Sequence, residues 1–403
     1  MKILILTTTF PRWKDDTTPA FVYELSKRLQ KEGFEIVVLA PHHEGAKRFE
    51  IIDGMKVYRF PYFYPKKYQK LAYEGGILSN LKRNHLAKLQ VPLLFLSELF
   101  YAIKIIKKER INFIHSHWII PSGLVGSILK RTYRKPHITT AHAGDVFTIR
   151  NSKILSKIGS FVFKNSDKIT ANSNYTKNAI TSIEDKIKDI VEIIPMGVDT
   201  SLFHPKHATG LRDDFEAEYL ILSVGRLVEK KGVKYLIMAM KDVIKEFPNA
   251  KLIICGAGPE EENLENLTKK LNLKENVIFV GYIKNSDLPK YYTSSDIFIL
   301  PSIKVKGGDT EGLGVVLLEA MACGTPVIGS NIGGIKDIIK DGKNGLLTES
   351  RNPKDISEKI IKLLENEELR KRFSKEGLKI VKEKFSWDVV TKRFVKIFQS
   401  AKQ

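Results

Sequence analysis

Two cationic side chains in the second half of the chain have the spacing to hold a diphosphate. Arg226 and Lys231 lie five positions apart in the segment GRLVEKKG, which directly follows the apolar run YLILSV. A guanidinium and an amine that meet at one point could offset the charge that develops on a diphosphate leaving group. We expect Lys230 to be solvated, and the plainer alternative is that Arg226 and Lys231 are solvated as well.

Two carboxylates flank the start of a predicted helix in the segment EGLGVVLLE. Gly312 and Gly314 precede the helix, so its first unpaired amides can approach a ligand without obstruction, and the helix dipole favours an anionic group there. Glu311, before the helix, and Glu319, two turns along it, could accept hydrogen bonds from vicinal sugar or ribose hydroxyls. The alternative is an exposed loop carboxylate and a solvated helix residue.

A histidine ends a predicted strand in the first half of the chain. His142 closes the strand 137–142 before a small-residue turn, where an imidazole can donate to a substrate hydroxyl or leaving group; a structural histidine is the alternative. We expect no metal site, because the sequence has no Asp-x-Asp triplet and no His pair at ligand spacing on a predicted helix. We also expect His115 and His117 to point to opposite faces of their strand.

The composition argues against several other classes of protein. A chain of 403 residues is long enough for two or three domains, each with its own core. Its two cysteines, Cys255 and Cys323, cannot build a disulfide framework or a thiolate metal cluster. The first loop, at 8–18, has no glycine, so the phosphate-binding fingerprint of a dinucleotide-dependent dehydrogenase is missing there. The apolar window at 91–106 is interrupted by polar residues, so we expect no transmembrane helix. The cysteine usage suits a reducing interior, so we expect a cytoplasmic protein.

Positive charge is concentrated in the first half. Residues 1–195 contain 32 Lys and Arg against 17 Asp and Glu, a net +15, and residues 196–403 contain 34 against 29, a net +5. Such a surplus favours a bilayer surface, a nucleic acid or a phosphorylated substrate, and a lysine-rich solvated surface is the alternative. The segment YFYPKKYQKLAY at 62–73 mixes aromatic rings with three lysines. We expect it to contact an anionic membrane surface, with an ordinary loop beside the acceptor as the alternative.

Apolar runs of strand length alternate with segments of helical period, a pattern typical of parallel α/β sheets. Strands are predicted at 2–7, 35–41, 111–117, 137–142 and 168–173, and again at 219–224, 251–255, 276–280, 296–300 and 326–329. Helices are predicted at 21–33, 98–109, 232–247, 260–271, 313–322, 355–384 and 386–400. We therefore predict two Rossmann-like, doubly wound α/β domains, 1–195 and 196–385, that face a cleft, with the helix 386–400 packed back on the first. The loops after the strands are where ligands of such sheets bind.

Taken together, these motifs resemble the family 4 glycosyltransferases of the GT-B fold. The similar segments are GRLVEKKG, PSIKVKGGDTEGLGVVLLEAMACGTPVIGSNIGGIKDIIKDGKNGLL, IIPMGVDTSLFHP, FPRWKDDTTPAFVYELSKRL, IHSHWIIPSGL and TTAHAGDV. The resemblance covers nearly the whole chain. It implies a retaining, metal-independent hexosyltransferase without a cofactor, which moves a sugar from a nucleotide diphosphate donor to a hydroxyl acceptor. A lipid-linked or glycan acceptor of cell-surface glycan synthesis fits such an enzyme, on the cytoplasmic side of the membrane.

The resemblance also implies a role for each candidate residue. Arg226 and Lys231 would hold the donor diphosphate, Glu311 the hydroxyls of the transferred sugar and Glu319 the ribose. His142 would contact the sugar near the reacting carbon. Further donor contacts would come from the amides of Gly312, Leu313, Gly314, Val315 and Val316. The first domain would then serve the acceptor and the second the donor.

The sequence departs from the family pattern at two places. Many relatives carry a glycine pair in the first loop, where this chain has Asp16, Thr17 and Thr18, and many carry a glycine where it has Ala143. Two other functions stay open: a sugar nucleotide epimerase, and a nonenzymatic scaffold that docks on nucleic acid or membrane through its positive half. With glycosyl transfer preferred, no nucleic-acid partner is expected. GDP-mannose, UDP-glucose and UDP-N-acetylglucosamine all remain candidate donors.

Overall fold

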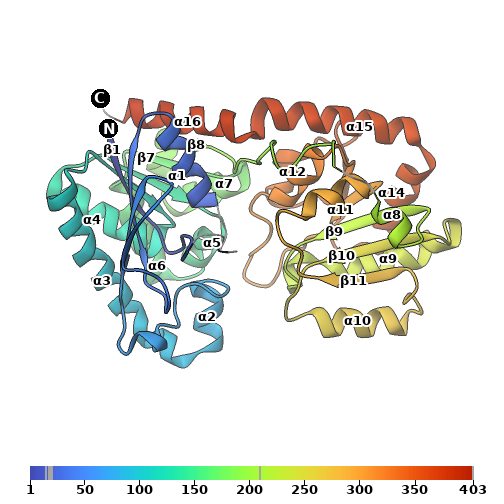
Figure 1. Cartoon of the computed structure of the whole chain (residues 1–403), viewed down its shortest axis with the longest axis horizontal. Coiled ribbons are helices and arrows are strands. Elements are labelled where there is room, and N and C mark those ends of the chain that lie inside the picture. Colours follow the sequence, from blue (N-terminus) through green and yellow to red (C-terminus); the bar gives the residue numbers. More distant parts are fainter. Residues whose placement is uncertain (14–15, 17–20, 208–209, 402–403) are drawn as a thin grey trace. The chain divides into compact units, whose positions relative to one another are not determined.

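Residues 1–13, 16, 21–207 and 210–401 are described by the computed structural model, and they divide into two α/β units (Figure 1). The first unit consists of Met1–Asn172, Thr176–Ile194 and Thr391–Gln403, and the second of Ser173–Tyr175 and Pro195–Val390. Compared with the predicted boundaries, the second unit gains Ser173–Tyr175, Pro195 and the residues up to Val390. Thr17 and Thr18 of the first loop lie outside the described residues.

An eight-stranded sheet forms the centre of the first unit, in the order β3-β4-β2-β1-β5-β6-β7-β8. Its strands are β1 (Lys2–Leu6), β2 (Glu35–Pro41), β3 (Phe49–Ile52), β4 (Met55–Phe60), β5 (Phe113–His117), β6 (His137–Ala141), β7 (Lys168–Ala171) and β8 (Val191–Ile193). Neighbouring strands are parallel except for the β3-β4 hairpin. The central strands are continuous apolar runs because helices cover both faces of a parallel sheet.

The helices of the first unit follow the strands in crossover connections. They are α1 (Phe21–Lys31), η1 (Lys66–Tyr68), α2 (Ile77–Arg83), α3 (His85–Glu109), η2 (Ile119–Gly123), α4 (Leu124–Tyr133), α5 (Gly144–Arg150), α6 (Lys153–Lys164), α7 (Asn174–Ile183) and η3 (Asp185–Ile190). The last helix, α16 (Trp387–Ser400), returns to this unit from Thr391 onward. There the ring of Phe398 packs 5.5 Å from that of Phe34 and 5.9 Å from that of Phe113.

A six-stranded parallel sheet forms the centre of the second unit, in the order β11-β10-β9-β12-β13-β14. Its strands are β9 (Tyr219–Val224), β10 (Ala250–Cys255), β11 (Val277–Gly281), β12 (Ile297–Leu300), β13 (Val327–Ser330) and β14 (Leu346–Thr348). Its helices are α8 (Leu211–Asp214), η4 (Glu229–Lys231), α9 (Val233–Glu246), α10 (Glu261–Lys270), α11 (Leu288–Ser294), α12 (Val315–Ala322), α13 (Ile335–Ile338), α14 (Pro353–Glu365), α15 (Glu367–Ile380) and η5 (Val381–Phe385).

The strand order of this second sheet reverses between β9 and β12. The chain runs outward from β9 to β11 and then crosses back to β12, on the other side of β9. In open parallel sheets, ligands bind beyond the carboxyl ends of the strands at such a reversal. The loops that follow β9 and β12 are the segments 225–232 and 301–314, which carry the candidate cations and Glu311.

Several elements differ from the prediction. Strands β3, β4, β8 and β14 were not predicted, and α12 begins at Val315 rather than at residue 313. The predicted helix 355–384 is three segments, α14, α15 and η5, because Asn366 ends α14 and its side chain caps α15 by accepting a hydrogen bond from the Leu369 amide.

The helix α3 is longer than predicted. It begins at His85, not at residue 98, and continues through Pro92, Ser97 and Glu98, the polar and proline positions that interrupt the apolar window of the sequence. Among the described residues it is the one helix long and apolar enough to cross a membrane by length and composition, where we expected none. Nevertheless one of its sides is buried in the first unit, including the side chains of Leu94 and Ile105.

Candidate active site

The two loops beyond β9 and β12 are tied to each other by their backbones. The amide of Ile303 donates to the carbonyl oxygen of Lys230 at 2.8 Å. At Gly232 an added Cβ would lie 2.1 Å from the carbonyl oxygen of Pro301, and the residue has a φ of 65°. Only glycine tolerates both conditions. The close approach places Lys231 directly beside the loop that carries Glu311.

Lys231 and Glu311 form an ion pair at this point. The Nζ of Lys231 donates to Oε2 of Glu311 at 2.6 Å, and the two side chains are only 16% and 15% exposed. The Ser302 hydroxyl donates to the same oxygen at 3.4 Å. Burial alone would raise the pKa of Glu311, but the charge and hydrogen bond of Lys231 outweigh it and lower that pKa below its ordinary value. Glu311 is therefore ionised at neutral pH.

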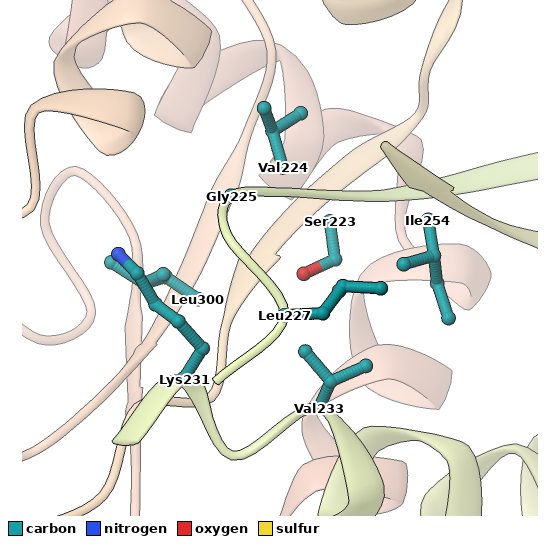
Figure 2. Close-up of a pocket in the computed structure, with 8 residues that line it drawn as sticks. All are labelled: Ser223, Val224, Gly225, Leu227, Lys231, Val233, Ile254 and Leu300. Atoms are coloured by element: carbon teal, nitrogen blue, oxygen red, sulfur yellow. The ribbon is translucent and has the colours of Figure 1, made fainter. Parts of the chain in front are cut away.

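A small pocket lies under the turn that leads to Lys231 (Figure 2). It is lined mainly by apolar side chains, including Leu227, Val233 and Ile254, and the amine of Lys231 points away from these three. Its volume of about 10 Å³ corresponds to roughly one water-sized sphere. The pocket is therefore a packing void below the loop, and the charged end of Lys231 is directed toward Glu311 instead.

The backbone around Glu311 is supported by a glycine pair. The Gly334 amide donates to the carbonyl oxygen of Glu311 at 3.0 Å. A Cβ on Gly333 would lie 2.2 Å from that oxygen, and one on Gly334 would lie 2.0 Å from the carbonyl oxygen of Gly312. This pair is visible in the sequence, but we assigned it no role there. It allows the segment before α13 to pack against the loop.

The start of α12 presents free amides beside the ion pair. Within the described part of the chain, the backbone amides of Leu313, Val315 and Val316 donate to no backbone carbonyl, and the first helical bond of this turn runs from the Leu317 amide to the Gly314 carbonyl at 2.9 Å. Such amides can donate to an anionic ligand. The donor contacts that the sequence suggested for the amides of residues 312–316 stay a prediction.

Glu319 lies on α12 and is held by a tyrosine. The hydroxyl of Tyr292, on α11, donates to Oε2 of Glu319 at 2.8 Å, and the tyrosine side chain is fully buried. Burial raises the pKa of Glu319 to about 7, against the hydrogen bond from Tyr292 and the charge of Lys231, which both lower it. The solvated alternative for Glu319 is therefore wrong. Tyr292 is a residue that the sequence gave no reason to choose.

The other two cations of the loop after β9 behave differently from Lys231. The Arg226 side chain is exposed and makes no hydrogen bond or ion pair with the described residues, so the structure does not bring it to Glu311. Lys230, which we expected to be solvated, pairs with Asp309 at 3.3 Å. The loops thus leave Arg226 available for a ligand.

His142 belongs to the first unit, where it is part of a group of histidines. Its Nε2 lies 3.1 Å from Nδ1 of His117, and its backbone amide donates to Oδ1 of Asp145 at 3.0 Å. The other oxygen of Asp145 accepts from the Ile119 amide, also at 3.0 Å, so this carboxylate joins the loops after β6 and β5. Burial lowers the pKa of His142 to about 3. The imidazole is therefore neutral at physiological pH.

The expected orientation of His115 and His117 was wrong. Their ring centroids are 4.3 Å apart on the same side of β5, because side chains two positions apart in a strand share a face. The His115 Nε2 bonds to the Thr140 hydroxyl at 2.8 Å. In the described ranges no group of three or more His, Cys, Asp or Glu side chains is arranged to hold a metal ion.

Comparison with known proteins identifies the family to which this chain belongs. The family model for group 1 glycosyl transferases matches residues 212–380, and that for glycosyltransferase family 4 matches residues 19–202. An uncharacterized glycosyltransferase of Methanocaldococcus jannaschii is 33% identical over 87% of this chain and 92% of its own length. The chain belongs to the family 4 glycosyltransferases. It is therefore an enzyme that transfers a sugar from a nucleotide-sugar donor.

A second relative and two solved structures add detail to this family 4 glycosyltransferase. A GDP-mannose-dependent monoacylated α-(1-6)-phosphatidylinositol monomannoside mannosyltransferase of Corynebacterium glutamicum is 32% identical over 74% of the chain and 78% of its own length. Sucrose-phosphate synthase of Thermosynechococcus elongatus has a TM-score of 0.80 at 21% identity and 99% coverage of both chains. Anabaena HepE in complex with UDP-glucose has a TM-score of 0.75 at 17% identity, over 99% of this chain and 100% of that one. The fold is thus that of GT-B glycosyltransferases, as predicted.

Proposed function

We propose that this glycosyltransferase is a retaining, metal-independent hexosyltransferase whose donor site is built around Lys231 and Glu311. The observation that carries the proposal is the largely buried ion pair at the reversal point of the second sheet. Opposite charges hold one another there until a ligand with both a diphosphate and hydroxyls can satisfy each of them. An unpaired charge at such a place would be strongly destabilising.

A bound donor would separate Lys231 from Glu311, because its diphosphate and its sugar each take one of the two side chains. Its diphosphate takes Lys231, together with the exposed Arg226 and the free amides at the start of α12. Glu311, released from the lysine, accepts hydrogen bonds from hydroxyls of the sugar. Glu319 accepts from the ribose through the oxygen that Tyr292 leaves free, since the tyrosine occupies Oε2. No cofactor other than the donor is needed.

The chemical step that we propose takes place on one face of the sugar. The bond between the anomeric carbon and the departing phosphate oxygen breaks, and the acceptor oxygen bonds to the same carbon from the same side. The departing phosphate oxygen takes the acceptor's proton, so the configuration at carbon is retained. Lys231 and Arg226 neutralise the negative charge that develops on the diphosphate. This is why we expect turnover without a divalent cation.

His142 would contribute hydrogen bonds rather than charge. Its neutral ring, paired with His117, can donate to or accept from a sugar hydroxyl close to the reacting carbon. The loop that carries His142 is held by the hydrogen bonds of Asp145, which fix the position of the ring within the first unit.

The acceptor that we propose is a hydroxyl carried by a lipid or a glycan, reached from the cytoplasmic side of a membrane. The support is the positive charge of the first half and the phosphatidylinositol mannoside named for the Corynebacterium relative. The relative named for GDP-mannose and the structure with UDP-glucose leave the base and the hexose open.

A donor panel followed by a transfer assay tests the proposal. A nucleotide sugar at 100 times its dissociation constant should add about 2.7 kcal/mol to the free energy of unfolding. The donor that stabilises the protein in this way is then used in radiolabelled form in a transfer assay, with alkyl glycosides as acceptors and with EDTA present. We expect transfer with retained configuration by NMR, and its loss in Lys231→Ala but not in Lys234→Ala, an exposed neighbour. Inverted product, a requirement for metal, or normal transfer by Lys231→Ala would contradict the proposal.

A further inference from the structure

The outer side of α3 exposes a stripe of large apolar side chains. Leu89, Leu93, Leu96 and Phe100 are 69%, 41%, 58% and 53% exposed. Their spacing of four, three and four residues places them on one face of the helix. The opposite face of α3 is buried in the first unit, so this stripe lies on the outer side of the helix.

The loop beside α3 also exposes two aromatic rings. The Gln90 side chain donates to the carbonyl oxygen of Tyr68 at 2.7 Å and accepts from the Lys70 amide at 3.1 Å, which fixes the loop against the helix. The rings of Tyr64 and Tyr68 are 65% and 44% exposed. We call the following residues together the α3 surface: Tyr64, Tyr68, Leu89, Leu93, Leu96 and Phe100.

Exposed apolar side chains are concentrated in this part of the chain. Of the fourteen large hydrophobic side chains that are exposed among the described residues, eight lie between residues 64 and 100. Single exposed apolar residues are ordinary, but a group of neighbours marks a contact surface. Figure 1 shows α3 next to α2 and α4.

The segment that carries the α3 surface is rich in positive charge. Residues 61–110 contain ten Lys and Arg and three acidic residues, and two of the three, Glu98 and Glu109, are buried. The amine of Lys104 lies 4.1 Å from the ring centre of Phe100, and that of Lys67 lies 5.2 Å from the ring centre of Tyr68. Long cationic side chains beside exposed rings suit the boundary between headgroups and acyl chains.

We propose that the α3 surface docks this protein on an anionic bilayer leaflet, with α3 lying in the interface rather than crossing it. This inference rests on the proposed function in one respect: docking on a membrane would bring the enzyme to a lipid-linked acceptor. A crossing is opposed by the buried side of the helix, which is part of the core of the first unit. The segment 62–73 chosen from the sequence contributes less than expected, because Tyr62 and Tyr73 are buried.

A second copy of the chain is a poorer occupant of the α3 surface than a lipid leaflet. A two-fold interface brings the same patch of both subunits together. It would therefore bring together two copies of a segment, 61–110, that contains ten Lys and Arg and only one exposed acidic residue, Glu74. Anionic headgroups instead neutralise those charges while the apolar stripe enters the acyl region.

Vesicle cosedimentation tests the apolar half of the proposal. The full chain is mixed at low salt with vesicles of phosphatidylglycerol and phosphatidylcholine, or of phosphatidylcholine alone. We expect binding to the anionic vesicles, and a loss of roughly 30-fold in partition coefficient for Leu96→Ser/Phe100→Ser, which is about 2 kcal/mol at 1.4 kcal/mol per factor of ten. The control Ile51→Ser/Ile154→Ser removes two apolar residues outside 61–110 that are more exposed than Leu96 and Phe100, and it should stay within twofold of wild type.

The same assay tests the charged half. Lys104→Gln/Lys107→Gln should weaken binding to anionic vesicles about 25-fold, from roughly fivefold for each lysine, and 1 M salt should abolish the difference. Lys274→Gln/Lys354→Gln, two exposed lysines of the second unit, should bind as wild type does. No binding by wild type, or equal losses in variants and controls, would overturn the proposal.

Two further readouts distinguish a membrane surface from a protein interface and from the donor site. If Leu96→Ser/Phe100→Ser converted a dimer into a monomer in light scattering without changing vesicle binding, the α3 surface would be a protein interface and the proposal would be wrong. Thermal shift with nucleotide sugars and transfer to a soluble acceptor report on the proposed function separately. We expect both to be unchanged in Leu96→Ser/Phe100→Ser, and a Lys231→Ala variant to bind vesicles normally.

Discussion

Removing the hydroxyl of Tyr292 should shift the pH at which the enzyme loses its nucleotide. Tyr292 donates to Oε2 of Glu319 at 2.8 Å, and burial already holds the pKa of Glu319 at about 7. A hydrogen bond to a charged group is worth about 1.5–3 kcal/mol, and one pKa unit corresponds to about 1.4 kcal/mol. Tyr292→Phe should therefore raise the pKa of Glu319 by roughly one to two units, because the ionised form loses its partner.

The consequence is measurable by calorimetric titration with a nucleoside diphosphate between pH 6 and 9. If the ionised Glu319 accepts from the ribose, wild-type affinity falls as the pH drops through about 7. In Tyr292→Phe the same fall should occur one unit or more higher. The neighbouring Tyr291, whose hydroxyl has no hydrogen bond among the described residues, gives the control Tyr291→Phe with a wild-type profile. Identical profiles for wild type and Tyr292→Phe would refute the reasoning.

Two further predictions concern stability and loop geometry. Burial raises the pKa of Glu98 to about 8, so the folded state keeps a proton that the unfolded state releases, and the free energy of unfolding falls by up to about 1.4 kcal/mol per pH unit between the unfolded pKa and 8. Glu98→Gln should remove this slope in urea denaturation at pH 5 and 9. The same pH dependence of stability in wild type and Glu98→Gln would contradict this prediction. Gly334→Ala places a Cβ 2.0 Å from the Gly312 carbonyl oxygen and should lower kcat at least tenfold by displacing Glu311. The control Gly210→Ala adds a Cβ in open space and should leave kcat unchanged. Equal kcat values for Gly334→Ala and wild type would contradict the supporting role of Gly334.

The central strands could be predicted because they are buried on both faces, which requires continuous apolar runs. The hairpin of β3 and β4 was missed because Glu50, Lys56 and Arg59 interrupt its apolar pattern. Its signal was nevertheless present: Asp53 and Gly54, both at positive φ, are a dipeptide typical of two-residue hairpin turns. This turn dipeptide, and not the apolar pattern, therefore indicates the strand pair.

Only the positions of the candidate site residues after the ends of strands could be predicted from the sequence. Lys231 and Glu311 follow two strands that the sequence could identify. Their contact depends on β12 lying next to β9, and no local sequence pattern predicts this strand order. The choice of Tyr292 as partner of Glu319 depends on the packing of α11 against α12. The outer face of α3 was overlooked because polar residues such as Glu98, which point into the first unit, interrupt the apolar pattern.

The most direct test of the donor site is the turnover of Glu311→Gln with the donor that stabilises the wild-type enzyme. This substitution keeps the shape of the side chain and removes the charge that pairs with Lys231. We predict that transfer falls at least 100-fold, about 2.7 kcal/mol of transition-state stabilisation, while the affinity for the nucleoside diphosphate without its sugar changes by less than about threefold. Transfer at the wild-type rate by Glu311→Gln would contradict the assignment of this pair as the donor site.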